Sequence, residues 1–254
     1  MPVKQVVFCC SGSVFAGCVF GVLLPFLAWP APSWSAGAYT VRKWTLDEGL
    51  PDSQVCGVAA GRDGYLWLVT ARSLVRFDGL HFVTVPLPAQ AAVGRNDGVF
   101  QDGAGGLWVY GFFGAARFAD GAWWQSEAGG VPRGRVTSVT EGPGGAVYLA
   151  QARALYEWRA GAVRAVLDAA SLGDRAGGFR QLVWNREGGL WIAAGDGLFR
   201  WTPDKGEAPR RMTDIRAEWV LPASPDQPLV AHGSFVCLRR KDGAWERLPD
   251  AKPV

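Results

Sequence analysis

The chain has 254 residues, including 34 glycines and 13 tryptophans, and carries a formal net charge of +3. With 49% hydrophobic and 19% charged residues, this composition is typical of a folded globular protein and excludes an intrinsically disordered chain. The charge is too small, and the basic residues are too scattered, to predict a surface that binds nucleic acid.

Residues 1–38 differ from the rest of the chain and predict a secretory signal peptide. Lys4 precedes an apolar stretch over 6–29, and the small residues 35–38 follow it. This order favours export and cleavage after Ala38. One alternative is an uncleaved leader that anchors the chain in a membrane. Another is lipidation of Cys18, although the apolar residues that follow it are unlike a polar tether.

Residues 39–254 contain one unit repeated about every 41 residues. Its anchors are Trp67, Trp108, Tyr148, Trp191 and, in a degenerate fifth unit, Val230. A second aromatic position follows at Phe77, Phe118, Trp158 and Trp201. Apolar residues alternate with a period of two, which predicts strands. The period and the pattern together predict an all-β fold, a β-propeller with five visible four-stranded blades whose core holds the tryptophan anchors.

The first unit shows the expected order of elements. We expect an inner strand over 55–59, a second strand over 66–70, a third over 74–77 and an outer strand over 81–85. Turn glycines recur at Gly64, Gly105, Gly145 and Gly188, where a tight reversal favours a positive φ. The blades are expected at 46–86, 94–125, 134–167, 179–211 and 217–249. Both a closed ring and an open arc of a larger propeller are compatible with this pattern.

Two cysteines, Cys56 and Cys237, lie outside the leader, in the first and last units. A disulfide between them requires that these blades be neighbours in a closed ring. The alternative is two thiols that pack as small apolar residues. The cysteine spacing does not match a zinc site, and no motif predicts a metal or a cofactor.

The segment 44–83 carries a specific pattern. It includes Trp44, Gly-Leu-Pro-Asp-Ser-Gln-Val at 49–55, Asp-Gly-Tyr-Leu-Trp-Leu at 63–68 and Leu-Val-Arg-Phe-Asp-Gly at 74–79, and related residues return at 188–192 and 195–200. These residues resemble the first repeat of the two-component regulator propeller family. The resemblance implies a periplasmic sensor region that signals through a histidine kinase, hybrid kinase or diguanylate cyclase. This chain shows no such output domain, so we expect a separate output domain or protein as its partner.

Ligand recognition is expected on the propeller face that carries the loops between blades and the turns after the second strands. The candidate ligand-binding residues there are Arg72, Arg95, Asn96, Arg135 and Arg180. Guanidinium groups suit carboxylate, sulfate or phosphate groups, so an anionic saccharide or another small ligand is predicted. The alternative is that these arginines are solvated or pair with aspartates such as Asp97. Phe112, Phe113 and Trp219 are the candidates for stacking against a ligand.

The sequence argues against an enzyme. The inner strands offer a single carboxylate, Glu218, near their starts, whereas a propeller glycosidase needs at least a pair. A propeller lyase needs a histidine on the channel face, and His232, expected in a turn, is the one candidate. We therefore predict a sensory, ligand-binding propeller without catalytic residues. A protein-interaction scaffold is the alternative, followed by a propeller lyase or glycosidase.

Overall fold

The computed structural model describes residues 42–173, 178–185, 189–224, 227–232, 235–239 and 244–248. The predicted signal peptide and its cleavage site lie outside these residues, as does the turn glycine Gly188. Within the described ranges, no helix is long and apolar enough to cross a membrane.

In the described part of the chain, twenty strands form five antiparallel sheets, each of four strands in chain order. The first sheet contains β1 (Val55–Ala60), β2 (Leu66–Thr70), β3 (Leu74–Phe77) and β4 (Phe82–Val85). The second contains β5 (Asn96–Gln101), β6 (Leu107–Gly111), β7 (Gly114–Ala119) and β8 (Ala122–Gln125). The third contains β9 (Val136–Glu141), β10 (Val147–Gln151), β11 (Ala154–Arg159) and β12 (Ala162–Asp168). The fourth contains β13 (Phe179–Trp184), β14 (Leu190–Ala194), β15 (Gly197–Trp201) and β16 (Arg210–Thr213). The fifth contains β17 (Trp219–Ser224), β18 (Gln227–His232), β19 (Phe235–Arg239) and β20 (Trp245–Arg247).

Helical structure in the described residues is limited to short segments. They are α1 (Ala89–Val93) and the 3-10 turns η1 (Leu46–Glu48), η2 (Pro143–Gly145), η3 (Ala169–Leu172) and η4 (Pro203–Lys205). Of these, α1 matters most for the site, because it lies in the segment that joins the first and second sheets.

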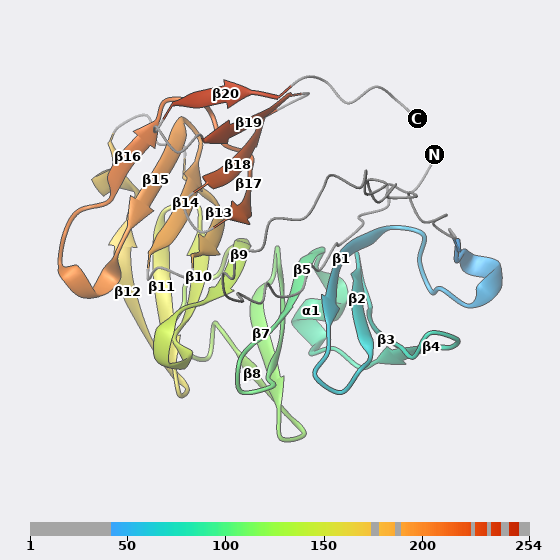
Figure 1. The fold of residues 1–254 in the computed structure, drawn as a ribbon. Coiled ribbons are helices and arrows are strands. Elements are labelled where there is room, and N and C mark those ends of the chain that lie inside the picture. The colour runs from blue at the N-terminus through green and yellow to red at the C-terminus, as the bar shows by residue number, and fades with distance from the viewer. Residues whose placement is uncertain are drawn as a thin grey trace, which may run out of the picture.

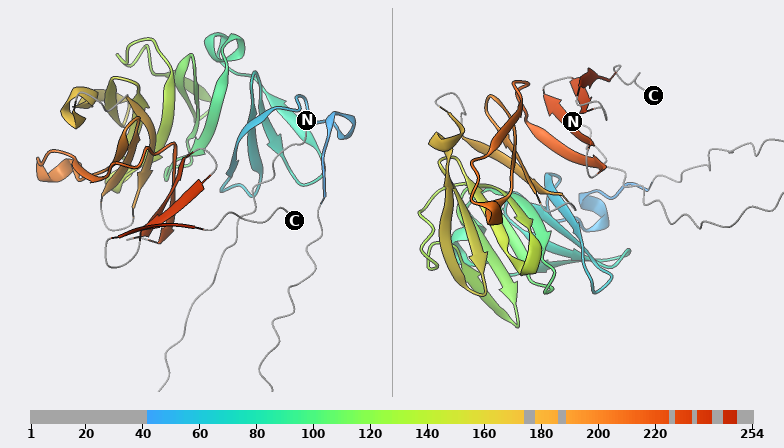
Figure 2. Two further views of the ribbon diagram at one scale, coloured as in Figure 1. Left: turned by 90° about the horizontal axis from the view of Figure 1, so that it is seen from above. Right: turned by 60° about the vertical axis from the view of Figure 1, so that its left-hand side comes forward.

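The five sheets follow one another around an open arc, with the first and fifth sheets at its two ends (Figures 1 and 2). The predicted all-β propeller with four-stranded blades is therefore confirmed. The sequence was compatible with a closed ring and with an open arc, and the described residues form an open arc. Cys56 and Cys237, which lie in the two end sheets, are both free thiols.

The core consists of layers between neighbouring sheets. Val69 and Leu74 of the first sheet pack with Val99 and Leu107 of the second. The anchors Trp108 and Trp191 are 0% and 1% exposed, as expected for core residues. Trp67 is only partly buried.

A buried carboxylate holds the anchor of the second sheet in place. Asp102 Oδ2 accepts hydrogen bonds from Trp108 Nε1 at 2.9 Å and from Arg117 Nε at 2.6 Å, and Oδ1 accepts one from the Gly106 backbone N–H at 2.7 Å. Burial alone raises the pKa of Asp102, but the Arg117 guanidinium and these hydrogen bonds outweigh it and lower the pKa below its usual value. In the first unit glycine replaces this aspartate at Gly61, and Trp67 Nε1 is buried without an acceptor.

Candidate functional site

Four inner strands carry the same irregularity at the same place. In β1, β5, β9 and β13, the register with the second strand skips the second residue of the inner strand. The skipped residues are Cys56, Asp97, Thr137 and Arg180. A β-bulge redirects its side chain and is common beside functional sites. The bulges therefore place four chemically different side chains at equivalent positions on one face of the arc.

The turns after the second strands meet the starts of the next inner strands on this face. The Asn96 N–H donates to the Ala71 carbonyl at 3.0 Å, and the Phe179 N–H donates to the Ala152 carbonyl at 3.2 Å. Arg72 and Arg95, which are the chain neighbours of Ala71 and Asn96, therefore flank the junction of the first two sheets. Arg180 lies in the same way at the junction of the third and fourth sheets.

Four side chains from the second and third repeats form a compact group, which we call the Asp97 cluster: Arg95, Asp97, Phe112 and Arg135. Arg135 Nε lies 2.6 Å from Asp97 Oδ2, and Arg95 Nε lies 3.9 Å from Asp97 Oδ1. The guanidinium carbons of Arg135 and Arg95 lie 4.5 and 6.0 Å from the centre of the Phe112 ring. Two cations thus share one carboxylate and one aromatic ring.

Both arginines of the Asp97 cluster are partly exposed, and Arg95 is the more exposed of the two. The Asp97 side chain is 13% exposed and is held by Arg135, whose side chain is 48% exposed, and the Arg95 side chain is 60% exposed. Phe112 is 50% exposed, so part of its ring faces solvent beside the two arginines. Because Arg135 already makes the short contact with Asp97, Arg95 has donors left for an anion. The cluster therefore presents guanidinium donors next to an apolar ring, an arrangement whose chemistry suits a negatively charged group.

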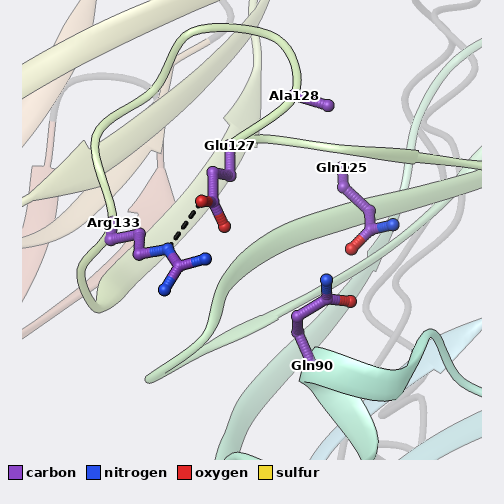
Figure 3. Close-up of a pocket in the computed structure, with 5 residues that line it drawn as sticks. All are labelled: Gln90, Gln125, Glu127, Ala128 and Arg133. Carbon is purple, nitrogen blue, oxygen red and sulfur yellow. Dashed lines mark hydrogen bonds and ion pairs between the residues drawn. The ribbon is translucent and has the colours of Figure 1, made fainter.

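A shallow hollow of about 360 Å³ lies between the two connecting segments that carry Arg95 and Arg135 (Figure 3). Gln90 of α1 faces Gln125 at the end of β8, and the Glu127–Arg133 ion pair of 2.6 Å lies on the other side. Amide and charged groups line this hollow, so it offers hydrogen-bonding partners to a polar ligand.

The structure brings together two of the five predicted ligand-binding residues, Arg95 and Arg135. Arg72 is exposed at the first junction, and Arg180 lies at the third-to-fourth junction, outside the Asp97 cluster; its Nε is buried without a partner. Asn96 was predicted to bind ligand on the exposed face, but the structure buries it completely, with 0% exposure. Its Nδ2 donates to the carbonyls of Thr70 and Ala71 at 3.2 Å each, so its amide joins the first two sheets.

The sequence suggested Asp97 only as a neutralising partner of loop arginines and did not predict that it lies between Arg95 and Arg135. Sequence reasoning also missed Gln90 and Gln125. One signal in the sequence could have pointed to Asp97. It occupies the same position in its repeat as Cys56, Thr137 and Arg180 do in theirs, because all four lie 11 residues before an anchor. Their importance depends on the bulge, and the bulge becomes visible only once the strands are paired.

The two histidines lie away from the Asp97 cluster. His81 comes just before β4, where its Nδ1 lies 3.3 Å from Asp78 Oδ2. His232 is the last residue of β18, whereas the sequence placed it in a turn. Among the described residues, no group of three or more histidine, cysteine or acidic side chains could hold a metal ion.

Neither the protein-family models nor the curated proteins match this sequence. The fold is similar to the extracellular domain of the hybrid two-component system BT3049 from B. thetaiotaomicron, with a TM-score of 0.67 and 13% identity over 81% of this chain and 31% of that one. It is similar to the extracellular domain of the one-component system BT4673 of the same organism, with a TM-score of 0.62 and 14% identity over 80% and 32% of the two chains. The chain thus spans about a third of the length of these extracellular domains.

A third similar structure is a catalytically inactive virginiamycin B lyase from Staphylococcus aureus with quinupristin. Its TM-score is 0.63 at 12% identity, over 79% of this chain and 71% of that one. The fold is that of a β-propeller. At these identities the likeness shows the fold alone, so the function has to be argued from the residues of this chain.

Proposed function

We propose that this propeller is a sensory recognition module that binds an anionic saccharide at the Asp97 cluster. In this proposal it belongs with the two-component regulator propellers, is exported to the periplasm, and passes its signal to an output domain or protein. The observation that carries the proposal is the convergence of Arg95 and Arg135 on one carboxylate and one half-exposed aromatic ring.

The chemistry of the cluster fits a uronic acid. Arg95 would bind the sugar carboxylate through charge-assisted hydrogen bonds, which are stronger than neutral ones. Phe112 would pack against the apolar face of the sugar ring, and Asp97 would accept a hydrogen bond from a sugar hydroxyl. Arg135 would keep Asp97 in place from the other side, at its 2.6 Å contact.

The similar folds support a sensory role, since two of them are extracellular domains of bacterial one- and two-component systems. The lyase fold favours the alternative of an enzyme. In the Asp97 cluster, however, the one carboxylate is paired with an arginine at 2.6 Å, which is an arrangement for charge pairing rather than for proton donation. We therefore propose recognition without catalysis.

The proposal is tested by calorimetry with glucuronate and, for comparison, neutral glucose. We expect glucuronate to bind more tightly than glucose and to bind more weakly as salt is added, since partly exposed charges are screened. The double variant Arg95→Ala/Arg135→Ala should lose glucuronate binding. Arg210→Ala, which removes an exposed arginine of β16, is the matched control and should bind normally. Equal binding of both sugars, or unchanged binding in the double variant, would reject the proposal.

A further inference from the structure

The first sheet exposes positions that the inner sheets bury. Val58 of β1 pairs with β2 in the same register as Val99, Val139 and Leu182 pair with their second strands. Val58 is 49% exposed, whereas these three equivalents are 8%, 7% and 3% exposed. Leu66 of β2 is 41% exposed, and its equivalents Leu107, Val147 and Leu190 are 3%, 0% and 0% exposed.

These positions belong to the sheet face that contacts the preceding sheet. Val99 and Leu107 pack against Val69 and Leu74 of the first sheet. Likewise, Leu182 and Leu190 belong to a cluster with Tyr148 and Ala150 of the third sheet. Among the described residues, the first sheet stands at one end of the arc and no sheet precedes it, so none of them packs a sheet on Val58 and Leu66 (Figure 1). We call this surface the head face.

The fifth sheet exposes the opposite face. Val220 of β17 is 1% exposed and packs with Trp191 and Ala193 of the fourth sheet. Successive residues of a strand point to opposite faces, so Trp219 and Leu221 point away from the fourth sheet. They are 62% and 55% exposed. We call this surface the tail face.

We propose that a second copy of this chain covers these surfaces, with the head face of one copy packed against the tail face of the other. Within one chain, each pair of neighbouring sheets already forms an interface of this type, so the contact between copies continues an interface that the repeat is built to make. Exposed apolar faces of this kind mark interaction sites. Because two different surfaces meet, the contact is heterologous. This inference is independent of the proposed ligand.

The test uses one charged substitution on each face of the full chain, Val58→Asp and Leu221→Asp. The control is Leu80→Asp, at a 65% exposed leucine in the turn between β3 and β4. Sedimentation over a range of concentrations should show self-association of the wild type and of the control. Each single variant should associate more weakly, on the order of tenfold or more, because an unpaired carboxylate would be buried at the contact.

Mixing the two single variants distinguishes a heterologous contact from a symmetric one. The Val58→Asp copy keeps its tail face and the Leu221→Asp copy keeps its head face, so the mixture should form a one-to-one dimer and stop there. Circular dichroism on each variant checks that it is folded. A wild type that stays monomeric, two variants that associate like the wild type, or a folded mixture without a heterodimer would each overturn the proposal.

Discussion

Replacing Asp102 with alanine should cost about 3–5 kcal/mol of the free energy of unfolding, because it breaks a buried ion pair from one side. The Asp102 side chain is 3% exposed and the Arg117 side chain 13% exposed. The substitution leaves the Arg117 guanidinium, Trp108 Nε1 and the Gly106 N–H without their acceptor in the core. Each buried donor left unpaired costs roughly 1–3 kcal/mol. Urea unfolding followed by tryptophan fluorescence measures the loss.

Glu127→Ala is the matched control for this prediction. The Glu127–Arg133 pair has the same N–O distance of 2.6 Å, but its side chains are 46% and 81% exposed. Its loss should cost about 0–1 kcal/mol, since solvent screens exposed pairs. If the two variants lose the same small amount of stability, burial does not determine the strength of the Asp102 contact and the reasoning is refuted.

Three further predictions concern pH, a sheet junction and the leader. The pKa of the Asp102 carboxyl is lower in the folded protein than in the unfolded chain. Its contribution to the free energy of unfolding is therefore fully present above about pH 4 and is lost as the pH falls through the folded pKa. Asp102→Ala should flatten this part of the curve of stability against pH. Asn96→Ala should cost about 1–2 kcal/mol in urea unfolding by removing the two hydrogen bonds to the preceding turn, and should leave glucuronate affinity unchanged in a folded variant; a tenfold loss of affinity would return Asn96 to the ligand site. Mass spectrometry of the exported protein should find an N-terminus between Ala36 and Tyr39, and an intact Met1 form in the membrane fraction would contradict cleavage.

The strands of the first unit could be predicted closely from the sequence. The second and third strands match the expected ranges, and β1 and β4 differ by one residue at an end. The reason is that Trp67 and Phe77 recur at a fixed spacing, and alternation determines which residues face the core. Closure could not be predicted, because it depends on how each sheet packs against the next and not on any one repeat.

The fifth unit shows where alignment of repeats fails. Counting from the anchors, Leu221 corresponds to Leu182 and should face the preceding sheet. In the structure Val220 takes that place instead. The register shift of β17 lies between Pro222 and Ser224, rather than at the second residue of the strand as in the other four sheets. A displacement of one residue moves every side chain to the other face of the sheet.

The candidate site could be predicted only in part for a related reason. The loop arginines were visible as a charged set, and Arg95 and Arg135 do converge. Asn96 was expected on the surface because it starts a strand after a loop. Its short amide instead reaches the carbonyls of the preceding turn, and this contact exists only once the first two sheets are packed together.

The most direct test of the central claim compares glucuronate with glucuronamide, its uncharged amide, in the wild type and in Arg95→Ala. A charge-assisted hydrogen bond contributes roughly 1.5–3 kcal/mol, so the wild type should prefer glucuronate by about tenfold or more. Arg95→Ala should bind the two ligands equally, since the group that distinguishes them is gone. A preference for glucuronate that persists in a folded Arg95→Ala variant would contradict the assignment of the ligand carboxylate to the Asp97 cluster.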